Sequence, residues 1–488
     1  VIGVDLNQGL SKRDKINSFV DILNQVIDFG IVKETKNQLK YTDVNIKPNL
    51  EGLNSTSFDK KNKILKSGYD EAMKYLEILD KLPKKNFDNL RMPINPIYSN
   101  IYKIDDVEVE NNKIYDKDYI IGKMTLKLPS SQTYGSINKM IDKLYATNNY
   151  KIINYEIIQK DNKNVLKLFV TEDNNRLFLK FGLHYDDIFK SGLLANITVK
   201  RLLFKNSSIS IDGVFGDKSR YYVNYFIDNG YIPGIGLNAS GMSFDLKSQD
   251  KLAYETWNWY RTELFIQSTW RNKLAIGGGI SYDVFNGKNL FTGDRRKTDY
   301  LNPYVFLKGD TQDSKTFPKR GYYTNIEAKS YDFIESGTKE KSFQIKADIR
   351  GNFPITKFLT YRLRTFYGVS FNTVDDFYQY HLGGIFEQNL VNFVKFNGYE
   401  FGEASNNNVF TVGNDFQFNF MKNYYVTASL SVGNLFDNFN DANFIKINYS
   451  SFGITAGYDS PFGQIKINYS NAFKDKPGII AVVLGHWF

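Results

Sequence analysis

The sequence contains no cysteine, only three histidines and no apolar run of about 18 residues. The absence of cysteine excludes a disulfide framework and thiolate chemistry. His184, His381 and His486 lie far apart on strand or loop patterns. We therefore expect structural or interfacial histidines, with no metal site and no catalytic triad. Because no long apolar run occurs, no transmembrane helix is expected.

Motifs for chemistry and targeting are lacking as well. No Gly-x-Ser-x-Gly elbow occurs, and the glycines of GIGLNASGMS do not have P-loop spacing. The IGGGIS stretch at 276–281 is expected to ease packing in a strand or lumen, and Asp5 to end a strand. The first residues lack the basic and apolar parts of a signal peptide, so an exported form would be a mature fragment or an internal piece. The sequence predicts no catalytic residue, no cofactor and no metal.

The charge is positive but dispersed. The net charge is +9, and the 62 basic residues are mixed with 53 acidic ones along the chain. A nucleic-acid binder would gather its basic residues into a patch, so no nucleic-acid partner is expected. Aromatic residues, by contrast, are plentiful, at 16% of the chain.

Residues 1–92 have an α/β pattern. VIGVDLN predicts a short strand, and residues 14–30 have helical apolar spacing with Gly30 as a stop. Residues 41–50 predict a strand ended by Pro48, and residues 58–82 predict one or two helices. This segment is too short and one-sided to be a complete doubly wound sheet.

Residues 93–175 predict a small α+β module of order βααββ. The expected elements are a strand at 100–110, helices at 116–124 and 136–149, and strands at 150–159 and 164–173 joined by a turn. The helix at 136–149 has Ile137, Ile141 and Leu144 on one face, which predicts its buried side.

Residues 176–488 alternate between apolar and polar side chains. SFQIKADIR at 342–350, for example, has Phe343 and Ile345 on one face and Lys346 and Arg350 on the other. About sixteen such segments of about ten residues are separated by Gly, Asn, Asp and Ser clusters, as in transmembrane barrels. Alternation also fits a soluble sandwich. Such a long soluble chain would, however, divide into domains or propeller blades, and no blade-length repeat occurs.

Aromatic residues at strand ends also favour a membrane barrel. They include Tyr221, Tyr222, Tyr322, Tyr323, Tyr424 and Tyr425. We therefore predict a mainly β protein with a 16-stranded antiparallel transmembrane β-barrel, an apolar lipid-facing band and a charged lumen that contains Arg350, Arg362 and Arg364. GIIAVVLGHWF at 478–488 is expected to be the closing strand, with Phe488 at an interface.

Several motifs resemble the superfamily of outer-membrane assembly and two-partner-secretion translocators. In GDTQDSKTFPKRGYYTNIEAK, Pro318 and Gly321 precede a long strand, as they do in that superfamily. HLGG at 381–384 and KFNGYEFGE at 395–403 resemble its inward-folded sixth loop, and a C-terminal aromatic such as Phe488 resembles its insertion signal. The loop positions that carry this resemblance are Gly383, Gly384, Lys395, Asn397, Gly398 and Tyr399.

Upstream of the barrel, residues 99–175 resemble a single POTRA domain. VIGVDLN at the start of the chain, DVNIKP at 43–48 and ILKSGYDEAMKYL at 64–76 resemble the C-terminal part of a patatin-like phospholipase domain, so residues 1–92 are similar to that part. This order is similar to that of type Vd autotransporters. The resemblance implies an outer-membrane barrel, a periplasmic POTRA domain and a lipid acyl hydrolase at the bacterial surface. The implied partners are outer-membrane lipids, the barrel-insertion machinery, periplasmic chaperones and the protein's own patatin passenger.

Two departures qualify this resemblance. Asn397-Gly398-Tyr399 stands where the family has Arg-Gly-Tyr or Arg-Gly-Phe, so a loop lock would need neutral hydrogen bonds or Lys395. The catalytic Ser and Asp motifs of patatins are absent, so the chain alone is expected to be inactive although an intact parent would be a serine acyl hydrolase.

Two questions stay open at this point. The protein could instead be an assembly or secretion factor for other polypeptides, or a passive pore. The lumen arginines could be an ordinary salt-bridged wall, a charged path for an unfolded chain, or a binding site for the sixth loop.

Overall fold

The computed structural model divides the chain into two units, residues 1–97 and 98–488, which are described separately. The structure describes the following residues: 1–6, 9–10, 25, 28–29, 32, 34–51, 53, 60–81, 101–229, 233–247, 254–270, 273–333, 342–372, 374–385, 391–438, 447–460, 463–473 and 476–485. None of the helices within these ranges is long and apolar enough to cross a membrane.

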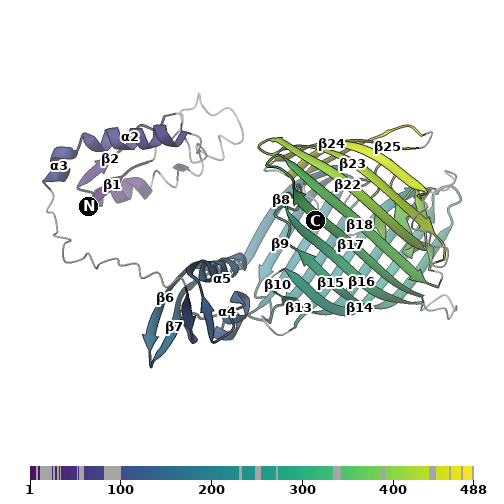
Figure 1. The fold of residues 1–488 in the computed structure, drawn as a ribbon, viewed down its shortest axis with the longest axis horizontal. Coiled ribbons are helices and arrows are strands. Elements are labelled where there is room, and N and C mark those ends of the chain that lie inside the picture. The colour runs from purple at the N-terminus through teal and green to yellow at the C-terminus, as the bar shows by residue number, and fades with distance from the viewer. Residues whose placement is uncertain are drawn as a thin grey trace. The chain divides into compact units, whose positions relative to one another are not determined.

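In the first unit, β1 (Ile2–Val4) pairs in parallel with β2 (Val44–Ile46), as Figure 1 shows. Asp5 follows β1 directly, and its carboxylate lies 3.0 Å from Lys47 Nζ, so it ends the strand as predicted. A short 3-10 turn, η2 (Leu39–Tyr41), precedes β2, and the helices α2 (Lys61–Met73) and α3 (Leu76–Asp80) come after it. Both strands and the two later helices confirm the sequence pattern, whereas most of the helix expected at 14–30 lies outside the described residues.

The second unit begins with a small α/β module. Its elements are β3 (Tyr102–Ile104), β4 (Asp106–Glu110), α4 (Lys117–Met124), β5 (Ser130–Gln132), α5 (Tyr134–Ala146), β6 (Tyr150–Lys160) and β7 (Lys163–Glu172). One sheet has the order β4-β7-β6, and β3 pairs separately with β5. The predicted face of α5, which is formed by Ile137, Ile141 and Leu144, is buried in the core of the module.

Local signals explain these boundaries. The side chain of Asp116 caps α4 by accepting a hydrogen bond from Tyr119 N–H at 2.8 Å, and Thr133 caps α5 in the same way. Asp161 and Asn162 have positive φ values of 50° and 60°, which suit the tight hairpin between β6 and β7.

The predicted order βααββ is wrong, because the observed order is ββαβαββ. The expected strand at 100–110 is divided at Asp105, so its two halves join different sheets. Strand β5 was missed because its three residues, Ser-Ser-Gln, have no apolar alternation.

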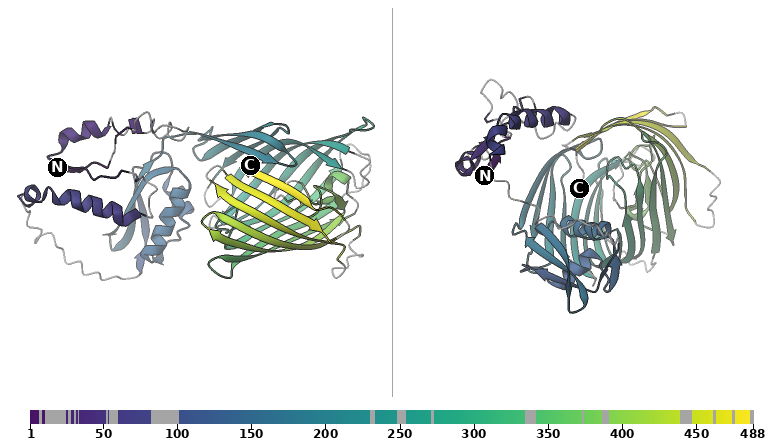
Figure 2. Two further views of the ribbon diagram at one scale, coloured as in Figure 1. Left: turned by 90° about the horizontal axis from the view of Figure 1, so that it is seen from above. Right: turned by 60° about the vertical axis from the view of Figure 1, so that its left-hand side comes forward.

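Sixteen antiparallel strands close a barrel, which confirms the predicted architecture (Figures 1 and 2). The last strand pairs with the first through Val483, Leu484 and Gly485, so it is the closing strand, while Phe488 lies outside the described residues. The strands are β8 (Leu177–Asp186), β9 (Lys190–Lys200), β10 (Ser207–Gly216), β11 (Arg220–Ile227), β12 (Gly234–Lys247), β13 (Tyr254–Trp270), β14 (Leu274–Asn289), β15 (Arg295–Asp310), β16 (Gly321–Phe333), β17 (Ser342–Pro354), β18 (Leu359–Phe371), β22 (Asn408–Met421), β23 (Tyr424–Phe436), β24 (Tyr449–Ser460), β25 (Gly463–Ala472) and β26 (Ile479–Gly485).

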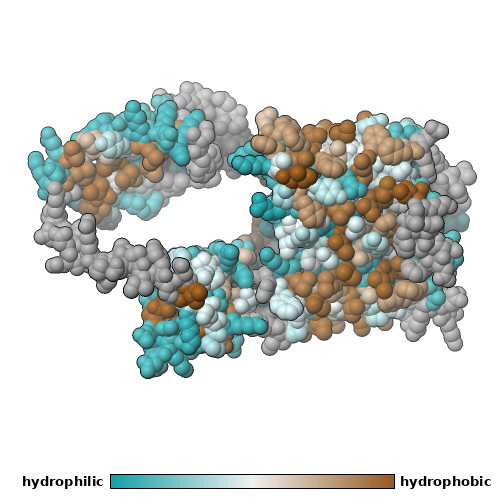
Figure 3. Space-filling model, in the orientation of Figure 1, coloured by the Kyte–Doolittle hydropathy of each residue, from teal (hydrophilic) through white to brown (hydrophobic). Residues whose placement is uncertain are grey.

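The two faces of the wall follow the predicted alternation. On β17, Phe343 and Ile345 are exposed on the outside, whereas Gln344 is 2% exposed and faces the lumen. Apolar residues accordingly cover much of the outer wall in Figure 3. Adjacent residues of a strand point to opposite faces, so the two tyrosines of a pair at a strand end cannot both face the membrane. Tyr424 is exposed on the outside, but Tyr425 is buried toward the lumen, so the prediction that Tyr425 lies at the membrane interface is wrong.

Candidate functional site: a plugged barrel lumen

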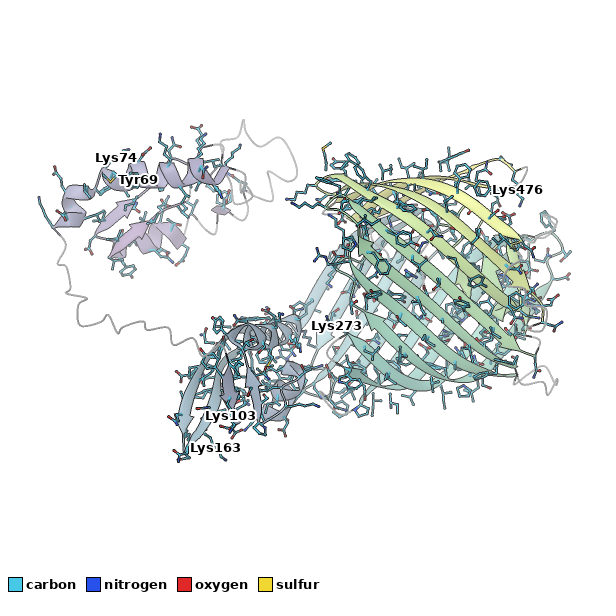
Figure 4. The ribbon with its side chains drawn as sticks, in the orientation of Figure 1. Tyr69, Lys74, Lys103, Lys163, Lys273 and Lys476 are labelled. Carbon is cyan, nitrogen blue, oxygen red and sulfur yellow. The ribbon has the colours of Figure 1, made fainter. Side chains whose placement is uncertain are left out.

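The lumen is defined by its two ends. Strand β8 begins directly after the module, so we call that end of the barrel the module end. The long connection from β18 to β22 leaves the other end and is called loop 6 (residues 372–407). Figure 4 labels Lys273, in a turn at the module end, and Lys476, in a turn at the loop-6 end.

Loop 6 folds into the barrel instead of extending from it. Its strands β19 (Tyr380–Leu382), β20 (Phe393–Val394) and β21 (Ala404–Asn406) form a small sheet, and a 3-10 turn, η5 (Asp376–Tyr378), precedes them. Tyr378, Tyr380 and Leu382 are fully buried. A Cβ atom on Gly368 of β18 would lie 2.3 Å from the Tyr380 ring, so only glycine at this wall position leaves room for the loop.

The start of loop 6 is fixed by a buried carboxylate on β14. The Asp283 side chain is fully buried and accepts hydrogen bonds from Tyr378 Oη at 2.8 Å and Asn302 Nδ2 at 2.7 Å. Its charge is balanced by Arg261, which donates from Nε and Nη2, and by Lys329 Nζ at 3.6 Å. A hydrogen bond to an ionised, desolvated group is stronger than one between neutral groups, so Tyr378 is firmly held.

Aromatic packing surrounds this attachment. The Phe377 ring stacks on Phe285, with centroids 4.6 Å apart, and meets Trp257 edge-on at 4.5 Å. The Arg296 guanidinium lies over the same Phe377 ring at 4.4 Å and pairs with Asp376 at 3.3 Å. The root of the loop is therefore attached by ionic, polar and aromatic contacts together.

The middle of the loop is joined to β17 by amide groups. Gln344 Nε2 donates to the Tyr378 carbonyl at 2.8 Å, and Asn392 Nδ2 donates to Gln344 Oε1 at 3.0 Å. Both amide side chains are about 2% exposed. They satisfy backbone groups that would otherwise be buried without partners.

The motif residues named from the sequence meet at the tip of the loop. Gly384 N–H donates to the Tyr399 carbonyl at 2.9 Å, and Gly383 has φ +132°, with no room for a Cβ atom beside the Glu400 carbonyl. Gly398 has φ +78°, and its N–H donates to Ser470 Oγ of β25 at 3.0 Å. The two sequence motifs, which are more than ten residues apart, therefore form one turn against the wall.

The Asn397 side chain lies in neutral surroundings. It is 3% exposed, and its Nδ2 is 3.1 Å from the position that a Cβ on Gly453 would take. Among the described residues, its Oδ1 accepts no hydrogen bond. Beside it, Lys476 pairs with Glu403 and lies 5.4 Å over the Tyr399 ring. Lys395 lies on the lining of the lumen cavity described below.

The three lumen arginines pair with neighbours in the wall. Arg364 makes a bidentate pair with Asp415 at 2.8 and 2.9 Å, and Arg350 pairs with Asp348 at 2.5 Å. Arg362 donates to Asn352 at 3.2 Å and Gln417 at 3.3 Å. The Asp415 carboxylate is therefore already paired with Arg364. A functional role for the three arginines stays a prediction.

A cavity of about 570 Å³ remains between loop 6 and the wall. Its charged lining is mixed, with basic residues in excess. The lining includes Asp212, Arg220, Arg261, Glu263, Lys308, Glu327, Lys346, Asp348, Arg350, Arg364 and Lys395.

The remaining residues named from the sequence lie elsewhere in the protein. Pro318 lies in the connection between β15 and β16, at the module end, and Gly321 is the first residue of β16. His184 contacts Asp186 at 2.5 Å beside the closing strand, and His381 Nε2 lies 3.0 Å from the Asp376 carbonyl, while His486 is outside the described residues. No group of three or more His, Cys, Asp or Glu in the described ranges could hold a metal.

Sequence reasoning missed Asp283, Asn302 and Tyr378. The alternation of β14 could have indicated Asp283. This acid lies on the same face of the strand as Ser281 and Phe285, and all three side chains are buried. No local pattern links that acid to Tyr378, which is 95 residues away.

Comparison with known proteins decides the family. A family model described as the OMP85 superfamily matches residues 164–488, about two thirds of the chain. The chain belongs to the OMP85 superfamily. It is therefore an outer-membrane translocator barrel. No curated protein sequence matches it.

Solved structures agree with this OMP85 fold. BamA from Haemophilus ducreyi lacking POTRA domains 1–3 has a TM-score of 0.58 at 13% identity, over 78% of this chain and 84% of that one. CdiB from Acinetobacter baumannii has a TM-score of 0.54 at 12% identity, over 79% of this chain and 74% of that one. At such low identity, these similarities show the fold.

Proposed function

We propose that this OMP85 barrel translocates or displays a patatin-like lipid acyl hydrolase, of which residues 1–92 form the C-terminal part. The observation that carries the proposal is the order of parts in one chain: an α/β unit with parallel strands, a ββαβαββ module and a plugged barrel. Parallel strands belong to sheets covered on both faces, as in an α/β enzyme domain. Yet Ile2 and Val4 are 49% and 59% exposed, as expected for part of a larger domain.

The module at 93–175 acts as a POTRA domain in this proposal. The similarity to BamA covers 78% of the chain, more than the roughly two thirds that the barrel from Leu177 onward supplies, so it extends upstream of the barrel. Strand β6 is at the edge of the three-stranded sheet, and an edge strand can hold an extended polypeptide by β-augmentation. The module would lie in the periplasm and the patatin region at the cell surface.

Loop 6 favours gated transport over a passive pore. Its buried residues occupy part of the lumen and leave a cavity of about 570 Å³, so steady conductance through the resting protein is not expected. Within the described residues, β26 pairs with β8 through three residues, whereas β8 pairs with β9 through ten. This seam is where we expect a polypeptide to part the wall.

Surface labelling tests the display function. An epitope tag at Glu51 should be accessible to antibody on intact cells expressing the full protein, and removal of residues 99–175 should abolish that signal. A tag that stays inaccessible until the outer membrane is permeabilised would contradict display. Equal display with and without 99–175 would contradict the role of the module alone.

The second candidate is an assembly or secretion factor that acts on other polypeptides, which the fold similarity to BamA and CdiB favours. The reading frame upstream of Val1 separates the two. An in-frame Gly-x-Ser-x-Gly with an Asp-Gly-Gly/Ala motif supports the lipase passenger, and its serine would be the nucleophile. A signal peptide that directly precedes Val1 would support the assembly factor.

A further inference from the structure

A second segment enters the lumen, at the module end. Residues 311–320, which connect β15 to β16, form what we call the strap. Phe317 of the strap is 3% exposed, and its ring stacks on Tyr425 of β23, with centroids 4.3 Å apart and an interplanar angle of 3°. A Cβ atom on Gly457 of β24 would lie 2.5 Å from the Phe317 ring, so this glycine provides the space for it.

The strap crosses the opening and does not follow its rim. It starts from neighbouring strands β15 and β16, but it docks on β23, β24 and β25. In the wall, β17, β18 and β22 lie between β16 and β23. Lys466 of β25 places its ammonium 4.9 Å from the Phe317 ring centre, so the contact extends to the fifteenth strand of sixteen.

Polar contacts secure the same docking site. Gln417 Nε2 donates to the Pro318 carbonyl at 3.1 Å, and Lys319 Nζ donates to Asn419 Oδ1 at 2.9 Å. Asn419 lies at a register shift between β22 and β23, which ends at Met421. A bulge re-aims the side chains around it, so the wall is locally shaped to receive Lys319.

The strap is also ordered internally. Asp313 Oδ1 accepts hydrogen bonds from the N–H groups of Lys319 at 2.8 Å and Arg320 at 3.2 Å. Gly321 follows the strap as the first residue of β16 and has φ +100°, and a Cβ atom there would lie 2.2 Å from the Thr311 carbonyl. These features give the segment one shape with a fixed base at Thr311 and Gly321, while its far end is held by the ring and polar contacts of residues 317–319.

We propose that the strap is a second closure of the lumen, located at the module end and separate from loop 6 at the other end. Phe317 is its latch, and Lys319 secures it. Opening requires that the Phe317 ring leave Tyr425 and Gly457 and that Pro318 and Lys319 give up their hydrogen bonds to β22, while the backbone at the base keeps its own hydrogen bonds. This role goes beyond the proposed display function, since it concerns how the barrel is sealed whatever polypeptide it carries.

Conductance in planar bilayers tests the proposal. The background is a barrel in which residues 374–406 are replaced by a short glycine-serine linker, so that loop 6 no longer seals it. In this background, Phe317→Ala with Lys319→Ala should raise the conductance several-fold. The matched control, Phe358→Ala with Lys357→Ala, changes an exposed pair at the same end and should leave conductance unchanged. Equal conductance with the strap released and intact would overturn the proposal.

A reversible link gives the same test within one folded protein. Because the chain has no cysteine, Lys319→Cys with Asn419→Cys can be joined by a short bis-methanethiosulfonate reagent in the Phe317→Ala variant, where the link alone holds the strap. The linked barrel should be closed, and a reductant should open it; no change on reduction would contradict the latch. If the shortened loop prevents folding, Tyr378→Phe supplies a background with a loosened loop 6 and an unchanged chain length.

Discussion

Strands β13 to β18 and β22, which we call the charged wall, place many charged side chains in the lumen. Strands β23 to β26 form what we call the neutral wall, where the described inward positions are neutral except for Asp459 and Lys466 near the module end. The root of loop 6 faces the charged wall, where Asp283, Arg261 and Lys329 form a buried ionic group that accepts a hydrogen bond from Tyr378. The tip faces the neutral wall, where the Gly398 N–H donates a hydrogen bond to the Ser470 hydroxyl.

This contrast explains how one loop can be both retained and released. Charge-assisted hydrogen bonds in a dry site are about twice as strong as neutral ones, so the root should stay when the tip leaves. A family loop with arginine at position 397 would need a carboxylate in the facing wall. Here both sides are neutral, and the tip depends on hydrogen bonds, on Lys476 and on the fit of its glycines.

The largest effect should come from the charged wall. Asp283→Asn removes the charge that balances Arg261 and Lys329, and leaving such charges unpaired costs about 3–5 kcal/mol. We expect the free energy of unfolding in detergent to fall by about that amount. Urea denaturation followed by tryptophan fluorescence measures it. Asp294→Asn, in an exposed turn beyond the same strand, is the matched control and should change little; an equal loss in both variants would remove the special role of Asp283.

Introducing a charge into the neutral wall should have the next largest effect. Asn397→Arg buries a guanidinium beside Gly453 and the neutral amide of Asn468, which should loosen the loop tip by about 3 kcal/mol. Asn468→Asp, whose amide lies 3.4 Å from the same Gly453 position, should restore much of the loss in the double variant. Limited proteolysis of loop 6 measures both. If the second change gives no rescue, the tip does not lie against β24 and β25.

The sequence alone predicted the barrel wall, but it did not predict the contacts that hold loop 6 in the lumen. Strand number and facing follow from a local period of two, so Gln344 and Phe343 could be assigned to opposite faces without any tertiary information. The Tyr378–Asp283 bond joins residues 95 positions apart, and nothing local specifies that distance. The tip motif was located by resemblance, but its neutral partner Ser470 could not be, because a serine in an alternating strand has no distinctive pattern.

A smaller effect is expected when the root loses one hydrogen bond but keeps its charges. Tyr378→Phe removes the hydroxyl that donates to Asp283 at 2.8 Å, and a bond to a charged acceptor contributes about 1.5–3 kcal/mol. Loop 6 should become more sensitive to protease while the barrel keeps its heat-resistant migration on gels. Tyr322→Phe, on the outer face, is the control. Unchanged sensitivity would mean that the aromatic contacts of Phe377 alone hold the root.

The smallest effect belongs to the tip. Ser470→Ala removes the hydroxyl that accepts from Gly398 N–H, so a buried donor loses its partner at a cost of about 1 kcal/mol. Hydrogen exchange at Gly398 should quicken by about fivefold, since that factor corresponds to about 1 kcal/mol. Ser470→Thr keeps the acceptor oxygen and should retain protection. If Ser470→Ala instead loosens loop 6 as much as Tyr378→Phe does, then the neutral wall holds the loop as firmly as the charged one, and the tip is not the part that releases first.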